Sequence, residues 1–250
     1  MNEINAPVAR RRRLIKALAA AGLLTNGGIM GFMQRALANG TNPVPPGLHK
    51  LKGTVTINGA AARAGQVVKP GDTVVTGKDG EAIFVIEQDA FLQRGDTTVS
   101  FGKTAADFMR VATGRILSVF GKGERQIKFA TAVIGIRGTA CYIETGEAQR
   151  NVGVTEGNPF SGTGGTAQER AYFCLCYGEA EITPTAAPEE RETIRTSHHD
   201  HPLYISNDMK MPSMMVSAPV INHTDAELIM LENLVGRLPP FYGQPDIEPY

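Results

Sequence analysis

Residues 67–86 read VVKPGDTVVTGKDGEAIFVI, in which two runs of β-branched and apolar residues each follow a cluster of turn-forming residues. Pro70-Gly71-Asp72 precedes the run at 73–76, and Lys78-Asp79-Gly80 precedes the run at 82–86. Pro, Gly and Asp favour tight turns, whereas Thr, Val, Ile and Phe fit the surface of a pleated sheet. The stretch therefore predicts two short β-strands separated by a tight turn.

The same alternation of turns and strands extends to both sides of this stretch. Asn58-Gly59 follows the run at 54–57 and suits a hairpin, because both residues tolerate positive φ. Turns that recur about every ten residues, with no helical pattern between them, predict a mainly β fold, a compact sandwich or roll. We place this domain at residues 53–183, with a Gly/Thr-rich insertion at 145–168. Further apolar runs lie at 97–101, 114–120, 126–129 and 131–139.

The segment from Val67 to about Ile143 resembles the FecR-type domain, named for the periplasmic portion of the ferric-citrate signalling regulator. The resemblance rests on the paired turns quoted above, on GRILSVF at 114–120 and above all on ATAVIGIRGTA at 130–140. It implies a FecR-like β domain that senses or transmits a signal across the envelope without catalysis, often toward a sigma factor. The motif residues of interest are Gly135, Arg137, Gly138 and Thr139.

Arg137 stands between two glycines in this motif. Gly135 and Gly138 allow a bend or bulge, which places Arg137 between two strands, where it could pair with a carboxylate. A structural ion pair and a ligand contact are both open to such an arginine. We favour the ion pair, because structural networks hold charges as readily as binding sites do.

The N-terminus has the features of a twin-arginine export signal. Arg11, Arg12 and Lys16 fit the export motif, a mildly apolar stretch follows, and Ala36 and Ala38 suit signal-peptidase cleavage. We therefore expect residues 1–38 to be a cleaved leader that the twin-arginine translocase exports in the folded state to the bacterial periplasm. A retained membrane anchor is the alternative, but Thr25, Asn26 and two glycines interrupt the apolar stretch, and a span needs about 20 mostly apolar residues.

The net charge of the chain limits the kinds of molecule that it could bind. The 25 basic and 25 acidic residues of the whole chain become 19 and 24 when residues 1–38 are removed. A net negative charge argues against a nucleic-acid partner, which would need a basic face. Few residues precede Ala17, so a cytoplasmic region that holds a sigma factor is not expected. The resemblance then implies an orphan exported module, and we expect another envelope protein as its partner.

Residues 39–52 read as an N-terminal linker, and residues 184–250 as a C-terminal extension with a single short amphipathic helix at 225–235. Thr224 and Glu227 have capping-box spacing, and Gly236 suits the C-terminal cap. The apolar stripe of this helix should dock on the β domain and bring His223 toward the sheet. The stripe consists of Leu228, Leu231, Leu234 and Val235.

Three cysteines and a group of histidines are the candidates for chemistry. Cys174 and Cys176 share one face of an expected strand, because side chains alternate along a strand. Either thiol could form a disulfide with Cys141 on a neighbouring strand, which would leave one buried free thiol. Alternatively, the thiols and nearby imidazoles could bind zinc, copper or iron, or a haem. We favour a disulfide or plain core packing over a metal site, because C-x-C lacks the usual C-x₂-C spacing and no haem-attachment motif is present.

The histidine candidates for such a site lie in the C-terminal extension. The sequence SHHDHP at 197–202 allows His199 and His201 to lie on one side of an extended segment, with Asp200 as an orienting group or a ligand. His198 would then point away. His223 is the third candidate, because docking of the helix would bring it toward the sheet.

No enzyme motif is recognisable in the chain. It contains neither a phosphate-binding glycine loop nor a nucleophile elbow. The leading hypothesis is a non-catalytic periplasmic FecR-like sensing or interaction module, with a link to signalling or iron-related envelope processes. The alternative is a metal- or haem-binding protein that handles metal or electrons through its Cys and His residues. A structural scaffold of the envelope is the third hypothesis.

Overall fold

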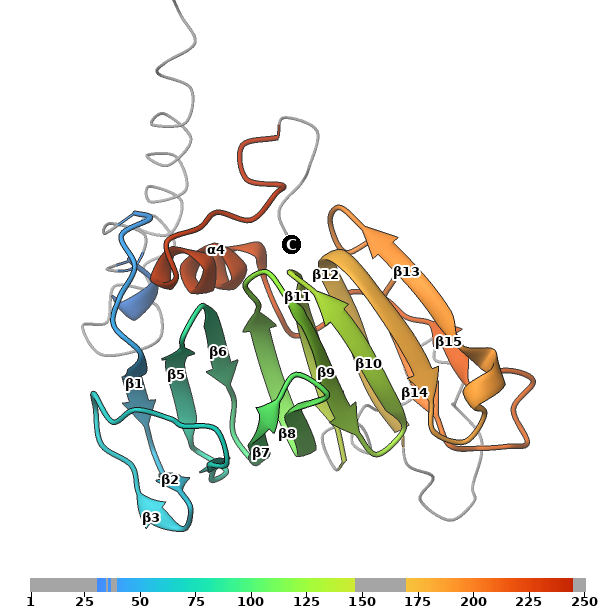
Figure 1. Ribbon diagram of the computed structural model, residues 1–250, viewed down its shortest axis with the longest axis horizontal. Helices are drawn as coiled ribbons and strands as arrows, with labels where there is room; N and C mark the ends of the chain where they lie inside the picture. The colour runs from blue at the N-terminus through green and yellow to red at the C-terminus, as the bar shows by residue number, and fades with distance from the viewer. Residues whose placement is uncertain (1–30, 35, 37–39, 147–169, 245–250) are drawn as a thin grey trace, which may run out of the picture.

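The computed structural model describes residues 31–34, 36, 40–146 and 170–244. Its fold is mainly β, with fifteen strands, a 3₁₀ turn η1 (Pro188–Glu190) and the helix α4 (Asp225–Leu234) (Figure 1). The expected mainly β fold is thereby confirmed. Arg11, Arg12, Lys16 and Ala38 of the export signal, and almost all of the insertion at 145–168, lie outside the described residues.

The strands form two sheets that share two long strands. Sheet A has the order β1 (Gly47–Lys52), β5 (Glu81–Ile86), β6 (Asp89–Gln93), β8 (Asp107–Val119), β11 (Ala140–Thr145), β12 (Arg170–Pro184), β14 (Leu203–Ser206) and β15 (Met215–Ser217). Sheet B has the order β3 (Ala60–Ala61), β2 (Val55–Ile57), β4 (Thr73–Thr76), β7 (Thr97–Thr104), β8, β9 (Glu124–Phe129), β10 (Ala132–Arg137), β12 and β13 (Glu192–Thr196).

The two shared strands cross between the sheets at glycines. β8 leaves sheet B and enters sheet A at Gly114, and β12 leaves sheet A and enters sheet B at Gly178. Both glycines have positive φ, +98° and +99°, which other residues rarely adopt. A Cβ at Gly178 would lie 2.6 Å from Thr139 Cγ2, so the crossing also requires the missing side chain. Because of these two kinks, β8 and β12 each belong to both sheets.

The first hydrophobic core fills the space between the two sheets. It contains Phe84, Phe91 and Ile143 from sheet A and Val99 and Ile134 from sheet B, among other buried residues. Such burial on one face of each sheet is the arrangement of a β-sandwich, in which inner faces interdigitate. The expected compact β fold is thus confirmed, and the shared strands close its core into a barrel: β8, β9, β10, β12 and β11 pair in turn, and β11 pairs with β8.

A second core lies on the opposite face of sheet A. Alternation along β11 places Ile143 in the first core and Tyr142 in the second. The apolar residues of α4 cover this outer face, and Leu228 and Leu231 are fully buried there. Figure 1 shows α4 close to β5 and β6. Met33 and Ala36, from the end of the expected leader, also belong to this second core.

The helix begins and ends as its sequence predicts. Thr224 is the N-cap and accepts a hydrogen bond from the Glu227 backbone N–H, while the Glu227 side chain accepts one from the Thr224 N–H. This is the expected capping box, in which two otherwise unpaired backbone donors are satisfied. Gly236, with φ of +77°, follows the last turn. The helix is thus fixed at the position that its caps specify.

The ends of the β region differ from the expected boundaries. β1 lies inside the segment 39–52 that we interpreted as a linker, and it pairs with β5 at the edge of sheet A. β13, β14 and β15 lie inside the expected C-terminal extension and continue both sheets. Both differences have the same cause, because a short edge strand gains its stability from pairing with a partner strand rather than from its own sequence pattern. No helix in the described part of the chain is long and apolar enough to cross a membrane.

Candidate functional site

Two thiols of β12 face the C-terminal extension. Cys174 and Cys176 are two residues apart in the half of β12 that belongs to sheet A, and both side chains lie in the second core. Residues at i and i+2 of a strand point to the same face, so this arrangement is a direct consequence of the C-x-C pattern. The two sulfur atoms therefore share the space between sheet A and the segments that cover it.

His199 reaches this space from a tight turn after β13. Its backbone has φ of +54°, and its N–H donates to the Cys176 carbonyl oxygen at 3.0 Å. The Asp200 carboxylate stabilises the turn by accepting hydrogen bonds from Thr196 Oγ1 at 2.6 Å and from the Ser197 N–H at 2.9 Å. The segment is thus a turn and not the extended chain that we assumed.

This turn changes which histidines come together. His198 and His199 are buried, whereas His201 and Asp200 are exposed. The structure therefore places His201 away from the thiols, and Asp200 stabilises the turn instead of orienting an imidazole. The extended-chain interpretation was wrong on this point, because positive φ at His199 breaks the alternation of side chains.

His223 approaches from the segment just before α4. Its Nδ1 lies 2.7 Å from the Ile221 carbonyl oxygen, and its ring stacks on Tyr142 with 4.6 Å between ring centroids. Capping of α4 at Thr224 holds this segment against sheet A. The expectation that docking of the helix brings His223 toward the sheet agrees with these contacts.

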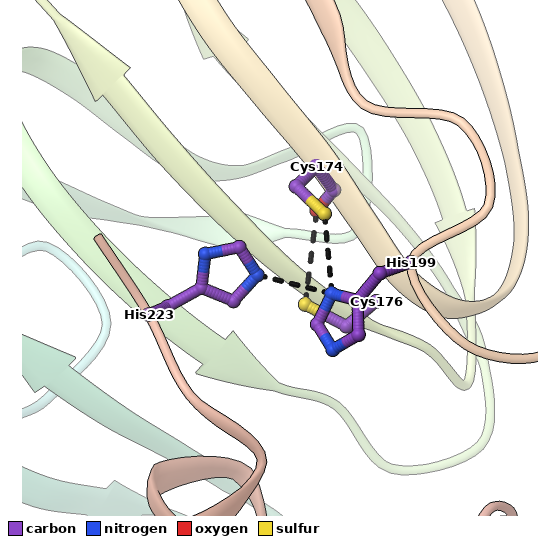
Figure 2. A group of neighbouring side chains, drawn as sticks. All are labelled: Cys174, Cys176, His199 and His223. Atoms are coloured by element: carbon purple, nitrogen blue, oxygen red, sulfur yellow. Dashed lines mark hydrogen bonds between the residues drawn. The ribbon is translucent and has the colours of Figure 1, made fainter. Parts of the chain in front are cut away.

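The four side chains form a compact buried group, which we call the Cys/His cluster: Cys174, Cys176, His199 and His223 (Figure 2). Cys174 Sγ lies 3.4 Å from His199 Nδ1, which in turn lies 3.1 Å from His223 Nε2. One potential ligand atom of each of the four residues lies within 4.8 Å of the others. Thiolate sulfur and imidazole nitrogen are ligands for zinc, copper and iron, so these residues could hold such an ion.

A carboxylate supports the histidines from behind. Asp225 Oδ1 lies 3.2 Å from His199 Nε2 and 3.0 Å from His198 Nε2. Asp225 is the first residue of α4, where the partial positive charge of the helix N-terminus also favours a carboxylate. Burial alone would raise the pKa of Asp225, but hydrogen bonds from His199 and His198 hold it below its ordinary value. Asp225 is therefore a carboxylate that accepts from both imidazoles.

The cluster separates charge between sulfur and nitrogen. Burial opposes ionisation of Cys174, but hydrogen bonds from Cys176, His199 and His223 outweigh it and hold the Cys174 pKa well below its ordinary value. Burial and the neighbouring Cys174 raise the pKa of Cys176 instead. Burial works against a charged His199, yet Asp225 and Cys174 raise its pKa to about 9. While no metal ion is bound, these shifts favour a thiolate at Cys174 and a proton on His199.

Cys141 lies on the other side of sheet A. It pairs in register with Leu175, and both side chains belong to the first core, whereas Cys174 and Cys176 belong to the second. All three cysteines are free and buried. The expected disulfide to Cys141 does not form, because a β-bulge after Ala140 and the alternation along the strands point the thiols to opposite faces.

The motif residues Gly135, Arg137, Gly138 and Thr139 lie in and after β10, outside the Cys/His cluster. Arg137 pairs with Glu124 on the exposed surface of sheet B, which agrees with the ion pair that we favoured. Gly138, with φ of +59°, and the buried Thr139 carry the chain from sheet B to sheet A. Gly135 and Arg137 line an open groove of about 470 Å³ together with Ala105, Ala106, Glu124, Arg125, Gln126, Ile136, Glu179, Glu181 and Thr193.

Sequence reasoning missed the role of Asp225 and assigned His198 to the wrong side. Asp225 follows His223 by two residues and stands at the start of a well-marked helix. An acidic residue at that position is common for helix stability alone, so its contact with two distant histidines left no separate signal. The available signal was the similarity of two short segments, SHHD at 197–200 and NHTD at 222–225. Each segment places a histidine next to a turn or a helix cap.

No protein-family model matches the chain, and no curated protein sequence matches it. Among solved structures, two crystal structures of a Parabacteroides distasonis protein assigned provisionally as an anti-sigma factor are similar to this one. Each has 6% sequence identity and a TM-score of 0.41, and the match covers 58% of this chain and 58% of that chain. The chain thus matches just over half the length of that protein.

Proposed function

We propose that this protein is a non-catalytic FecR-like sensing module of the bacterial periplasm, in which the C-terminal extension responds to the state of the Cys/His cluster. One observation carries the proposal: the cluster joins three segments that are far apart in the sequence. Cys174 and Cys176 belong to sheet A, His199 to the turn after β13, and His223 to the segment that leads into α4. A ligand bound there would contact all three segments at once.

Binding at such a junction is coupled to docking of the extension. Any ligand that contacts both β12 and His223 stabilises the conformation in which those groups are close, by mass action. The same coupling acts in reverse, so a partner that displaces α4 would weaken ligand binding. The cluster and the docked helix therefore form the two linked sites that a sensor needs.

In addition to its apolar contacts, α4 is held in its docked position by hydrogen bonds and ion pairs. Arg94 Nη2 lies 2.9 Å from Glu227 Oε1, and it also donates to the Asn222 carbonyl oxygen at 2.9 Å. Tyr177 donates a hydrogen bond to Glu232, which also pairs with Arg237 at 2.6 Å. Local opening of a segment costs less than global unfolding, and it depends on contacts of this kind. The helix α4 and the segment before it can thus respond while the β domain stays folded.

Burial of the cluster supports a binding role and not a catalytic one. The exposed fractions are 0% for Cys174 and Cys176, 3% for His199 and 5% for His223. A substrate would need a path to these atoms, whereas a small ion or a proton needs only a brief local opening. Sensing therefore fits the burial better than turnover does.

The test is the hydrogen exchange of α4 amides, measured by mass spectrometry on the full chain. We expect the variant Cys174→Ser/Cys176→Ser to lose protection at residues 225–234, because the junction loses two of its four groups. Cys141→Ser makes the same chemical change at an equally buried thiol of the other core and should leave α4 protection unchanged. Equal protection in all three proteins would refute the proposal, and denaturant unfolding would verify that each variant is folded.

A second candidate is a protein-binding module that uses sheet B. The observation that favours it is the groove that two of the four motif residues, Gly135 and Arg137, line and that carries charges of both signs. In that case Gly135→Arg would fill the groove and abolish binding to an envelope partner, while the cluster variants would bind normally. Crosslinking in whole cells with these two sets of variants separates the candidates.

A further inference from the structure

The hydrogen-bond partners of His223 fix which of its nitrogens carries the proton. Nδ1 faces the Ile221 carbonyl oxygen at 2.7 Å, and a carbonyl oxygen only accepts hydrogen bonds. Nδ1 must therefore be the donor. In the neutral ring this assignment leaves the lone pair on Nε2, which points at His199.

The partners of His199 give the matching result. Its Nε2 faces the Asp225 carboxylate at 3.2 Å, and an ionised carboxylate only accepts. Nε2 must be the donor, so the lone pair of the neutral ring is on Nδ1. That atom lies 3.1 Å from His223 Nε2 and 3.4 Å from Cys174 Sγ. When both rings are neutral, two nitrogen lone pairs and a sulfur lone pair thus point into one small buried space.

Lone pairs that face each other repel unless a positive charge lies between them. A proton can satisfy one pair of these atoms, but a metal ion satisfies all of them at once. We propose that the Cys/His cluster is a tetrahedral zinc site with the ligands Cys174 Sγ, Cys176 Sγ, His199 Nδ1 and His223 Nε2. This inference rests on the proposed sensing function, because it names the ligand that the module senses.

The spacing of the ligand atoms fits a tetrahedral ion. Zinc bonds of about 2.0 to 2.1 Å to nitrogen and about 2.3 Å to sulfur place tetrahedral nitrogen ligands about 3.3 Å apart, and sulfur and nitrogen about 3.6 Å apart. The corresponding distances are 3.1 Å between His199 Nδ1 and His223 Nε2 and 3.4 Å between Cys174 Sγ and His199 Nδ1. These two distances differ from the tetrahedral values by a few tenths of an ångström, and Cys176 offers its sulfur atom within 4.8 Å of the other three ligand atoms.

The chemistry of the ligands favours zinc over hard cations. Two thiolates balance the charge of a divalent ion in a buried space, and Cys₂His₂ is a common set in structural zinc sites. Mg²⁺ and Ca²⁺ prefer oxygen ligands, which this cluster lacks. All four positions of the tetrahedron are protein atoms, so the ion has no open position for a substrate. Asp225 completes the site as the carboxylate that orients His199.

The test is a zinc titration of the full-length protein against a competing chelator, together with the absorption spectrum after cobalt(II) substitution. We expect one zinc per chain and the visible bands of tetrahedral thiolate-bound cobalt(II) in the wild-type protein, in Cys141→Ser and in His201→Ala. The two control variants change a thiol of the other core and an exposed histidine beside the site. Cys174→Ser/Cys176→Ser and His223→Ala should lose this binding.

Several results would overturn the assignment. Zinc affinity that the cluster variants retain would place the metal elsewhere, and a wild-type protein that binds no zinc would leave only a thiolate and a protonated imidazole at the site. Copper or iron held in preference to zinc would exclude zinc as the resident ion. The cobalt(II) spectrum of the wild-type protein needs no variant, so it reports the geometry and the number of thiolate ligands even if a substitution impairs folding.

The two proposals fail in different ways. Binding of zinc without any change in the hydrogen exchange of α4 would refute the sensing function and keep the metal site. Loss of α4 protection in the cluster variants of a protein that binds no zinc would refute the metal site and keep the sensing function.

Discussion

Asp225 is the first residue of α4 and contacts the imidazoles of His198 and His199. Its orienting effect on these rings requires the ionised carboxylate, which can only accept hydrogen bonds. As a carboxylate it requires an N–H from both His198 and His199, so it fixes the ring orientation of each. The sequence allowed this role but did not predict it. By contrast, the shared face of Cys174 and Cys176 followed directly from alternation along a strand.

Asp225→Asn should weaken zinc binding about 10- to 100-fold, as outer carboxylates of metal-bound histidines generally do. The amide can donate as well as accept, so it no longer requires the His199 tautomer that exposes Nδ1. The competition titration measures this change. Asp107→Asn, at an exposed acid paired with Lys128, should bind zinc like the wild type. Equal affinities for all three proteins would contradict the orienting role of Asp225.

Asp89 provides a test of pH dependence away from the cluster. Burial raises its pKa to about 6, even though the Gly121 N–H and Arg125 favour the charged form; Arg237 acts in the same direction and Glu87 opposes it. A carboxyl with a raised pKa in the folded protein favours folding when it is protonated. Its contribution is therefore greatest below about pH 3.8 and falls as the pH rises through 6.

We expect the wild-type protein to lose about 2 kcal/mol of unfolding free energy relative to Asp89→Asn between pH 4 and pH 7. Denaturant unfolding of both proteins at several pH values gives this difference, and subtraction removes the contribution of other titrating groups. A difference that stays constant across this range would show that Asp89 has an ordinary pKa in the folded protein.

Among the elements, those with strong local signals were predicted well and the edge strands were not. The helix at 225–235 was expected from its caps and is α4 (Asp225–Leu234), and Asn58-Gly59 joins β2 and β3 with positive φ at both residues. β1 and β13 were missed, because their stability comes from pairing with β5 and β12. The sequence also did not predict the crossings of β8 and β12. A glycine within a run of strand residues gives the same sequence pattern whether the strand crosses between sheets or stays in one.

The crossing of β12 can be tested by substitution. Gly178→Ala should destabilise the protein by more than Gly65→Ala, although both glycines have positive φ. The backbone strain of about 1 to 2 kcal/mol is common to the two sites. Only at Gly178 does the added methyl group meet atoms, those of Thr139, whereas the space at Gly65 is open. Overpacking adds about 1 to 3 kcal/mol.

Thermal or denaturant unfolding of both glycine variants provides the comparison. Equal losses of stability would mean that a methyl group at Gly178 causes no steric clash with Thr139. Because Cys176 lies two residues before Gly178, the zinc titration of Gly178→Ala also shows whether the kink positions the cluster.

For the whole molecule, turn spacing predicted the layered β architecture, and the capping residues predicted the helix α4 that helps to cover the outer face of sheet A. Export remains a prediction of the N-terminal sequence. Replacing Arg11 and Arg12 together by Lys should retain the protein in the cytoplasm, because the twin-arginine pathway reads that pair. Cell fractionation followed by detection of the chain measures this. Unchanged delivery to the periplasm would point to another export route.

The strands of sheet A are synthesised before the helix that covers them, so an apolar surface is exposed for a time during synthesis. Sheet A is complete once β15 has been synthesised, but the helix that covers its outer face follows only at residues 225–234. Until then Leu117, Tyr142 and Tyr172 would lie on a bare apolar surface, and exposed surfaces of this kind promote aggregation during synthesis. We therefore expect the chain to be most prone to aggregation while sheet A has formed and α4 has not yet docked.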